Sequence, residues 1–291
     1  MLQLHYFRTV ARLEHMSKAA EELHIAQPAL SKTISRLEED VGVPLFDRRN
    51  RQIRLNVFGR AFLRKAEAAL AALEEGKREV AELAGLARGS VRIATNSLNR
   101  FSRALGAFRE LHPETKFRIV QVAPSATDEM VRLLEQGEAD LAFTAAAIDR
   151  PGVRELPVLR AEVCLAVPPG HRWNGVRSAI RLAEAASEPF VEYKPGHPYR
   201  RINDDFCRRA GIRPPVVCEV EEPSALASLV QAGLGVAFVP ASKCRSDTEL
   251  TLLTIEEPQC RRDFSVAWLE GRYQSEASRR FREFLVSYFA E

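Results

Sequence analysis

Residues 25–42, IAQPALSKTISRLEEDVG, carry a group of side chains suited to contacting another macromolecule. Apolar residues recur there at steps of four, three and four, which places them on one stripe of a helix. They are Leu30, Ile34, Leu37 and Val41. The opposite side carries mostly short polar or cationic residues: Gln27, Pro28, Ala29, Ser31, Lys32, Ser35 and Arg36. Donors of this size fit a DNA major groove, and Gln27 and Arg36 are best equipped to reach base edges. The alternative is an ordinary solvated helix face.

A second cationic group follows in the stretch DRRNRQIRLN. It places four arginines within seven residues: Arg48, Arg49, Arg51 and Arg54. Residues 1–60 contain ten Lys/Arg and seven Asp/Glu, whereas the rest of the chain is balanced, so the whole net charge of +3 lies in the first fifth. Guanidinium groups clustered in this way suit phosphates or the DNA minor groove, although a solvated turn would also tolerate them.

The elements around these residues predict how they are positioned. Helical spacing covers residues 2–14, and a short helix capped by Ser17 runs to Leu23. A tight turn at residues 24–26 then leads into the helix that starts near Pro28 and ends at Gly42. Two helices joined by a short turn form a helix-turn-helix, whose second helix can enter the major groove. Alternating residues 45–55 predict a β-hairpin wing that carries the arginines.

The run SKAAEELHIAQPALSKTISRLEEDVGVPLFDRRNRQIRL resembles the N-terminal winged helix-turn-helix of LysR-type transcriptional regulators. The matching positions are Ala20, Leu23, Gln27, Pro28, Ala29, Leu30, Ser31, Ile34, Leu37, Glu38, Gly42, Leu45, Phe46 and Arg48. The resemblance continues more weakly after residue 60. It implies a sequence-specific regulator that binds double-stranded promoter DNA, works with RNA polymerase and senses a small molecule through its C-terminal part. One departure is Ala26, where many members have Ser or Thr. Alanine has no side-chain oxygen to cap the helix that follows, which lowers the stability of that helix by about 1 kcal/mol.

The region after the wing predicts a long linker helix over residues 57–87, with Asn56 as its N-cap. A heptad seam recurs at steps of four and three through Phe62, Ala66, Ala69, Leu73, Gly76, Val80, Leu83 and Ala87. Such a seam pairs with another chain more often than with its own domain, and at 1.5 Å per residue the helix is about 46 Å long. In the family this helix dimerises, so a homodimer, or a homotetramer formed as a dimer of dimers, is expected.

From residue 89 onward, strands alternate with helices, which predicts parallel α/β sheets. The expected fold class is therefore α/β multidomain: residues 1–58 form the winged helix-turn-helix, with the helix-turn-helix at about 17–36 and the wing at about 45–55. Residues 57–87 form the linker helix and residues 89–291 a two-lobed effector domain. In the family this domain is of periplasmic-binding-protein type. Lobe I is expected to span 89–160 and 266–291, and lobe II 161–265. Hinge motion between the lobes would couple ligand occupancy to the dimer.

The expected effector cleft collects residues at strand ends and helix starts. They are Thr95, Asn96, Ser97, Ser125, Ala126, Thr127, Tyr193, Gly196, His197 and Glu222. Free N–H groups and hydroxyls at such positions suit an anion such as a carboxylate. Helix capping alone is an equal alternative for Ser97, Ser125 and Thr127. If Glu222 faces the cleft, it favours an amine or hydroxyl, so an amino acid or organic acid is the expected effector class.

Other function classes are less well supported. At 46% hydrophobic and 28% charged residues, without a long apolar run or a signal-peptide pattern, the chain is expected to be cytoplasmic and not to enter a membrane. The five cysteines form no Cys-x-x-Cys pair and the histidines lack ligand spacing, so neither a structural metal nor a cofactor is expected. Cys207 and Cys218 could still form a redox pair. No hydrolase or dinucleotide motif supports an enzyme, although Tyr193, His197 and Glu222 could form an acid–base set. An effector-independent or redox-responsive DNA-binding regulator is the alternative.

Overall fold

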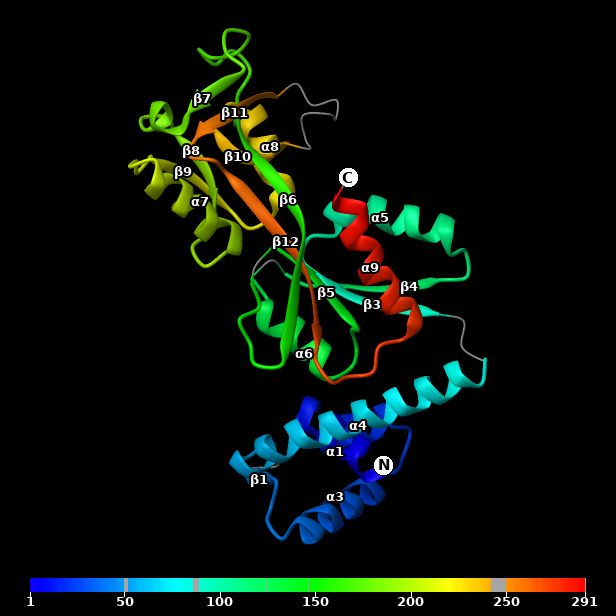
Figure 1. Cartoon of the computed structure of the whole chain (residues 1–291). Helices are drawn as coiled ribbons and strands as arrows, with labels where there is room; N and C mark the ends of the chain where they lie inside the picture. The colour runs from blue at the N-terminus through cyan, green and yellow to red at the C-terminus, as the bar shows by residue number, and fades with distance from the viewer. Residues whose placement is uncertain (50–51, 86–88, 124, 146, 242–249, 291) are drawn as a thin grey trace. The chain divides into compact units, whose positions relative to one another are not determined.

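The computed structural model describes the chain except for residues 50–51, 86–88, 124, 146, 242–249 and 291 (Figure 1). The chain divides into two compact units. The first contains residues 1–88 and the second contains residues 89–134 and 139–291. No helix in the described part of the chain is long and apolar enough to cross a membrane.

The first unit packs three helices, a hairpin and the start of a long helix around one apolar core. The elements are α1 (Leu2–Leu13), α2 (Met16–Glu22), α3 (Gln27–Val41), β1 (Phe46–Arg49), β2 (Gln52–Leu55) and α4 (Val57–Leu83). Phe7, Leu30 and Ile34 are fully buried, and Phe7 stacks edge-on against Phe62 of α4 at 5.2 Å. The core therefore fixes α3 from its apolar side and leaves its other side to solvent.

The ends of α2 and α3 agree in part with the sequence signals. Pro28 lies in the first turn of α3, Gly42 ends the helix with φ 84°, and Ala26 contributes no side-chain cap. The prediction that Ser17 caps α2 is wrong, because His15 holds that place and its Nδ1 accepts the N–H of Lys18 at 3.3 Å. Val41 was predicted to lie on the buried apolar stripe, but it is 36% exposed at the last residue of α3.

Helix α4 begins where the sequence predicts, with the Asn56 side chain accepting the N–H of Gly59 at 2.8 Å. Its first turns pack on α1, and Ala66 and Leu70 are buried. Farther along, three apolar side chains of the predicted seam are exposed. They are Leu73 at 43%, Val80 at 66% and Leu83 at 83%. Ala87, the last predicted seam position, lies outside the described residues.

The second unit is built on a mixed sheet. Its strands are β3 (Ser90–Thr95), β4 (Lys116–Gln121), β5 (Leu141–Thr144), β6 (Val153–Val167), β7 (Ala179–Arg181), β10 (Ala237–Pro240), β11 (Thr251–Glu257) and β12 (Arg261–Leu269). The order is β4-β3-β5-β12-β6-β11-β7, and β10 also pairs with β6. The expected parallel pairing holds for β4, β3 and β5. The pairing of β12 with β5 and β6, and of β10 and β11 with β6, is antiparallel.

Two lobes share this sheet, and the long strands β6 and β12 run side by side through both (Figure 1). Lobe I adds α5 (Leu98–Leu111), α6 (Thr127–Glu135) and α9 (Glu276–Ala290). Lobe II adds the 3-10 helix η1 (Leu182–Ala185), the strand pair β8 (Phe190–Tyr193) and β9 (Val216–Val220), and helices α7 (Pro198–Arg209) and α8 (Pro223–Gln231).

Separate cores fill the two lobes. In lobe I, Phe101 of α5 and Phe281 of α9 pack on one sheet face, whereas Met130 of α6 packs on the other. In lobe II, Phe206 of α7 packs with Phe190 and Phe238. On β6, Val158 belongs to the lobe I core and Val163 to the lobe II core. Likewise, Phe264 of β12 belongs to the lobe I core, and Cys260, just before β12, belongs to the lobe II core. β6 and β12 therefore contribute to the core of each lobe and connect the two.

Candidate functional site

The exposed face of α3 carries the residues that the sequence predicts for DNA. Gln27, Pro28, Ala29, Lys32 and Arg36 are exposed, and Ser31 and Ser35 are half-buried. The helix cannot rotate about its axis, because Leu30 and Ile34 are completely buried on the other side. The geometry thus presents a row of small and cationic side chains on one rigid helix, as major-groove contact requires.

Three cations of this surface make no ion pair among the described residues. Among the described residues, neither a hydrogen bond nor an ion pair engages the charged groups of Lys32, Arg36 or Arg54. Arg54 lies on β2 opposite Asp47 in the hairpin register. Arg51 lies outside the described residues, and for Arg49 only the backbone, in β1, is described. The positive charge of Lys32, Arg36 and Arg54 therefore remains available to an anionic partner.

Arg48 differs from these three cations because it forms an ion pair within the first unit. Its guanidinium donates to Glu38 Oε2 at 2.8 Å, while Glu38 Oε1 accepts the N–H groups of Leu45 at 2.8 Å and Phe46 at 3.2 Å. Glu38 thus ties the end of α3 to the first strand of the wing. Sequence reasoning gave it no site role, although its position four residues before Gly42 places it next to the chain that returns after the helix.

In the second unit, Ser97 makes the contact that joins the lobes. Its Oγ lies 2.9 Å from the Tyr199 hydroxyl and donates to Asn96 Oδ1 at 3.0 Å. Ser97 occupies the N-cap position of α5, yet its side chain makes no capping hydrogen bond. The Ser97 hydroxyl therefore does not cap α5, and it engages Tyr199 and Asn96 instead.

Behind Tyr199 lies a buried cation that the sequence analysis did not find. Arg262 of β12 is 2% exposed and stacks over the Tyr199 ring at 4.3 Å. Its Nη2 donates to Asn203 Oδ1 at 2.9 Å, and Asn203 Nδ2 donates to Glu192 Oε1 at 2.7 Å. Burial lowers the pKa of nearby Arg100, and the charge of Arg262 adds to that effect. We call Ser97, Tyr193, His197, Tyr199, Asn203 and Arg262 the interlobe cluster.

His197 presents a buried donor in this cluster. Its Nδ1 accepts the N–H of Tyr199 at 3.0 Å, so the neutral ring carries its proton on Nε2. Burial lowers the pKa of His197 to about 4, with a further contribution from Arg262, so the ring is neutral at pH 7. The Nε2 atom of His197 and the Nε atom of Arg262 are both buried without a hydrogen-bond partner in the described structure. Two orphan donors are a strong attraction for an anionic group.

The other predicted effector residues of lobe I lie near strand ends and differ in burial and in their hydrogen bonds. Thr95 is fully buried, with its hydroxyl bonded to Phe143 O and to Ser97 N, so it holds the turn in place. Asn96 contacts Thr144 Oγ1 at 3.4 Å. Ser125 is exposed, whereas Ala126 and Thr127 are half-buried at the start of α6.

The remaining two predicted residues lie in turns of lobe II. Gly196 has φ 88° in the turn before α7, a left-handed conformation that favours glycine. Glu222 is exposed at the N-cap position of α8 without a side-chain capping bond. The described contacts thus unite Ser97, Tyr193 and His197, whereas they do not bring Ser125, Gly196 or Glu222 to the same atoms.

Burial disfavours thiolate chemistry at two of the described cysteines. Cys164, Cys207, Cys218 and Cys260 are free thiols, and Cys244 lies outside the described residues. Burial raises the pKa of both Cys207 and Cys260 to about 12, which disfavours the reactive thiolate. Within the described part of the chain, no group of three or more His, Cys, Asp or Glu side chains could hold a metal ion.

Comparison with known proteins agrees with both halves of this geometry. Residues 1–60 match the model of the bacterial regulatory helix-turn-helix protein, lysR family, and residues 84–290 match the LysR substrate binding domain. The Bacillus subtilis (strain 168) regulator YybE is 34% identical, covering 99% of both chains. The transcriptional dual regulator GltC of the same organism is 30% identical, covering 99% of this chain and 97% of its own.

A solved structure with a similar fold is the LysR family regulator CbnR. It has a TM-score of 0.72 at 24% identity, covering 99% of this chain and 98% of its own. The same regulator has also been solved with its target DNA, with a TM-score of 0.61 at 26% identity and 99% of both chains covered. An exposed donor face on α3, a two-lobed α/β unit and these matches over nearly the full length lead to one conclusion: the chain belongs to the LysR family of transcriptional regulators, which bind DNA and carry an effector-binding domain.

Proposed function

We propose that α3 enters the major groove of operator DNA, where Gln27 and Arg36 read base edges and Lys32 contacts a phosphate. The single observation that carries this proposal is the exposed, uncompensated charge of Lys32 and Arg36 on a helix whose other side is completely buried. The small residues Pro28, Ala29, Ser31 and Ser35 between them let the helix approach the groove floor. Arg54 and the other wing arginines neutralise neighbouring phosphates.

Titration of the salt dependence tests this placement. An operator is first selected from random duplexes by the wild-type protein, and Lys32→Ala and Arg54→Ala are then titrated against it at several salt concentrations. Log K falls as log salt rises. Each lost phosphate contact should make this slope shallower by about 1. Arg181→Ala, an exposed arginine of lobe II, is the matched control and should leave the slope unchanged. Wild-type slopes in both α3 and wing variants would exclude this surface.

A second part of the proposal concerns assembly. Leu73, Val80 and Leu83 form an exposed apolar stripe along α4, with Ala69 before Leu73 and Gly76 between Leu73 and Val80. We infer that this stripe packs against α4 of a second copy and makes a homodimer, so that two helix-turn-helix units address a two-fold site. Contacts between the second units then join dimers into a homotetramer.

The effector is proposed to bind at the interlobe cluster as an anion. The buried donors His197 Nε2 and Arg262 Nε lie there without partners, and a carboxylate would satisfy both. The Ser97–Tyr199 contact is the link between lobes that such a ligand would replace or reinforce. An organic acid or amino acid has the required group. A redox-responsive regulator is less well supported, because Cys207 has a raised pKa.

Three further expectations belong to the same proposal. Promoter-bound protein would act on RNA polymerase, in keeping with relatives that are transcriptional regulators. A cytoplasmic location follows from that role. The chain would carry out no catalysis, since the described residues around His197 serve to hold α7 and contact aromatic rings.

A further inference from the structure

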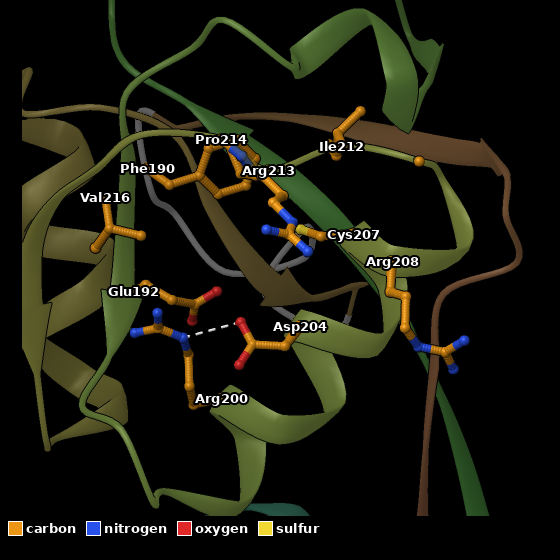
Figure 2. Close-up of a pocket in the computed structure, with 11 residues that line it drawn as sticks. Phe190, Glu192, Arg200, Asp204, Cys207, Arg208, Ile212, Arg213, Pro214 and Val216 are labelled. Carbon is orange, nitrogen blue, oxygen red and sulfur yellow. Dashed lines mark hydrogen bonds and ion pairs between the residues drawn. The ribbon is translucent and has the colours of Figure 1, made fainter.

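A cavity of about 560 Å³ lies within lobe II, bordered by α7, β8 and the segment that leads into β9 (Figure 2). Ligand pockets for small molecules begin at about 300 Å³. Phe190, Ile212, Pro214 and Val216 form its apolar wall. None of the residues proposed above for the interlobe ligand borders it. The cavity therefore requires an explanation of its own.

A buried carboxylate faces this cavity. Glu192 is 4% exposed, and its Oε1 accepts the N–H of Tyr193 at 2.9 Å and the amide of Asn203 at 2.7 Å. Among the described residues, no partner engages the second oxygen, Oε2. Asn203 and the backbone thus fix the carboxylate in place and leave one oxygen free to accept a hydrogen bond.

Asp204 supplies a second carboxylate beside it. Its Oδ1 accepts Arg200 Nε at 2.9 Å, and Figure 2 shows the Asp204 and Glu192 side chains pointing toward one another across the cavity. Arg200 also donates to Glu219 and to the carbonyl of Tyr193. Arg200 thus lies in the floor of the cavity and pairs with Asp204 and Glu219. Among the described residues, Glu192 Oε2 and Asp204 Oδ2 still have no hydrogen-bond partner and can accept from a ligand.

The opposite side of the cavity is cationic. The Arg213 side chain points into the cavity (Figure 2), and it has no ion pair or hydrogen bond among the described residues. Arg208 differs, because it turns away from the cavity and pairs with Asp205. Glu192 and Asp204 can therefore accept hydrogen bonds at one end of the cavity, and Arg213 can donate them at the other end.

We propose that this cavity is a second ligand site, separate from the interlobe cluster, which binds a free α-amino acid with an aliphatic side chain. The ammonium group donates to Glu192 Oε2 and to Asp204, and the carboxylate accepts from Arg213. The aliphatic side chain lies against Ile212 and Val216. Above about pH 7, where Glu192 is ionised, each charged group of the ligand then meets an opposite charge that the fold already holds in place.

Ligands with only one of the two charges fit less well. A simple carboxylic acid would bring a negative charge toward Glu192 and Asp204, which repel it. A simple amine would leave Arg213 without a partner. The site should therefore discriminate against both, since specificity comes from repulsion and unsatisfied groups as much as from attraction.

Binding to the full chain tests the assignment. The common L-amino acids are titrated one at a time by isothermal calorimetry at pH 8, where Glu192 is ionised. The best binder is then compared with the amine that lacks its carboxylate and the acid that lacks its ammonium group. We expect saturable binding of an aliphatic amino acid, and at least tenfold weaker binding of both analogues. Glu192→Gln and Arg213→Met should each weaken binding at least tenfold, whereas Arg181→Met, an exposed arginine elsewhere in lobe II, should not.

Several results would overturn the proposal. One is that no amino acid binds saturably, and another is that Arg213→Met, a surface change that should not disturb folding, leaves the affinity intact. Equal binding of the deaminated acid would also contradict it. If Ser97→Ala abolishes binding while Glu192→Gln does not, the amino acid occupies the interlobe cluster and the assignment to the lobe II cavity is wrong.

Discussion

At the scale of single residues, most of the chemistry of the second unit centres on buried polar groups that hold one another in place. Glu192, Asn203 and Arg262 form one hydrogen-bonded chain between the lobe II cavity and the Tyr199 ring. The sequence predicted Ser97, Tyr193 and His197 for this region but not Asn203 or Arg262. Nothing in the local pattern around Arg262 distinguishes it from the other arginines of an alternating strand. Only the pairing of β12 with β6 places it behind α7.

Glu192 gives a prediction about pH and stability. Burial raises its pKa from 4.5 to about 7, although Asn203 and Arg262 oppose the shift. The folded state therefore keeps the proton in a range where the unfolded chain has lost it, so stability is complete below pH 4.5 and declines as the pH rises to about 7. The loss amounts to about 3 kcal/mol.

Glu192→Gln should remove this contribution to the pH dependence. Thermal unfolding of wild type and variant between pH 4.5 and 7.5 provides the measurement. The wild-type melting temperature should fall more steeply than that of the variant over this range. Parallel curves would show that the carboxyl is already ionised in the folded protein, with Arg262 and Arg200 outweighing burial.

At the scale of elements, local signals in the sequence were sufficient for both ends of α3 and the start of α4, but not for the cap of α2. Pro28, Gly42 and Asn56 mark the helix ends where the structure has them. The strands were harder. β7, β11 and the first half of β6 were not predicted, because β7 is only three residues long and the early part of β6 alternates partly exposed residues without a clear apolar run. The antiparallel pairing of β12 with both β5 and β6 depends on contacts distant in sequence, which alternation of strands and helices cannot reveal.

Helix α3 can be strengthened at its uncapped start. Ala26 has extended backbone angles, φ −67° and ψ 133°, and offers no side-chain acceptor to the helix N-terminus. Ala26→Ser should supply that acceptor and stabilise the first unit by about 1 kcal/mol. Ala68→Ser, an exposed position within α4, is the control and should be neutral or slightly destabilising. Urea unfolding followed by helical circular dichroism measures both, and equal effects would show that position 26 cannot cap α3.

At the scale of the whole molecule, the account requires two copies of the chain on one operator. The exposed stripe on α4 is the surface proposed to join them, and a charge in its middle should separate them. Val80→Asp, at a residue that is 66% exposed, should leave the fold of each unit intact while the mass in solution falls by half, from the tetramer to a dimer that the second units hold together. Light scattering across a concentration series measures this. The control is Glu79→Asp, beside the stripe, and an unchanged mass for Val80→Asp would place the dimer contact elsewhere.

The central claim is that the exposed face of α3 reads a DNA sequence. The most direct measurement is the affinity of the full chain for its selected operator and for a scrambled duplex of the same length and composition, at one fixed salt concentration. We expect the chain to prefer the operator by at least about 4 kcal/mol. Arg36→Ala should reduce that preference by about 1–3 kcal/mol while leaving binding to the scrambled duplex nearly unchanged. Equal affinity of the wild type for both duplexes, or an undiminished preference in Arg36→Ala together with Gln27→Ala, would contradict it.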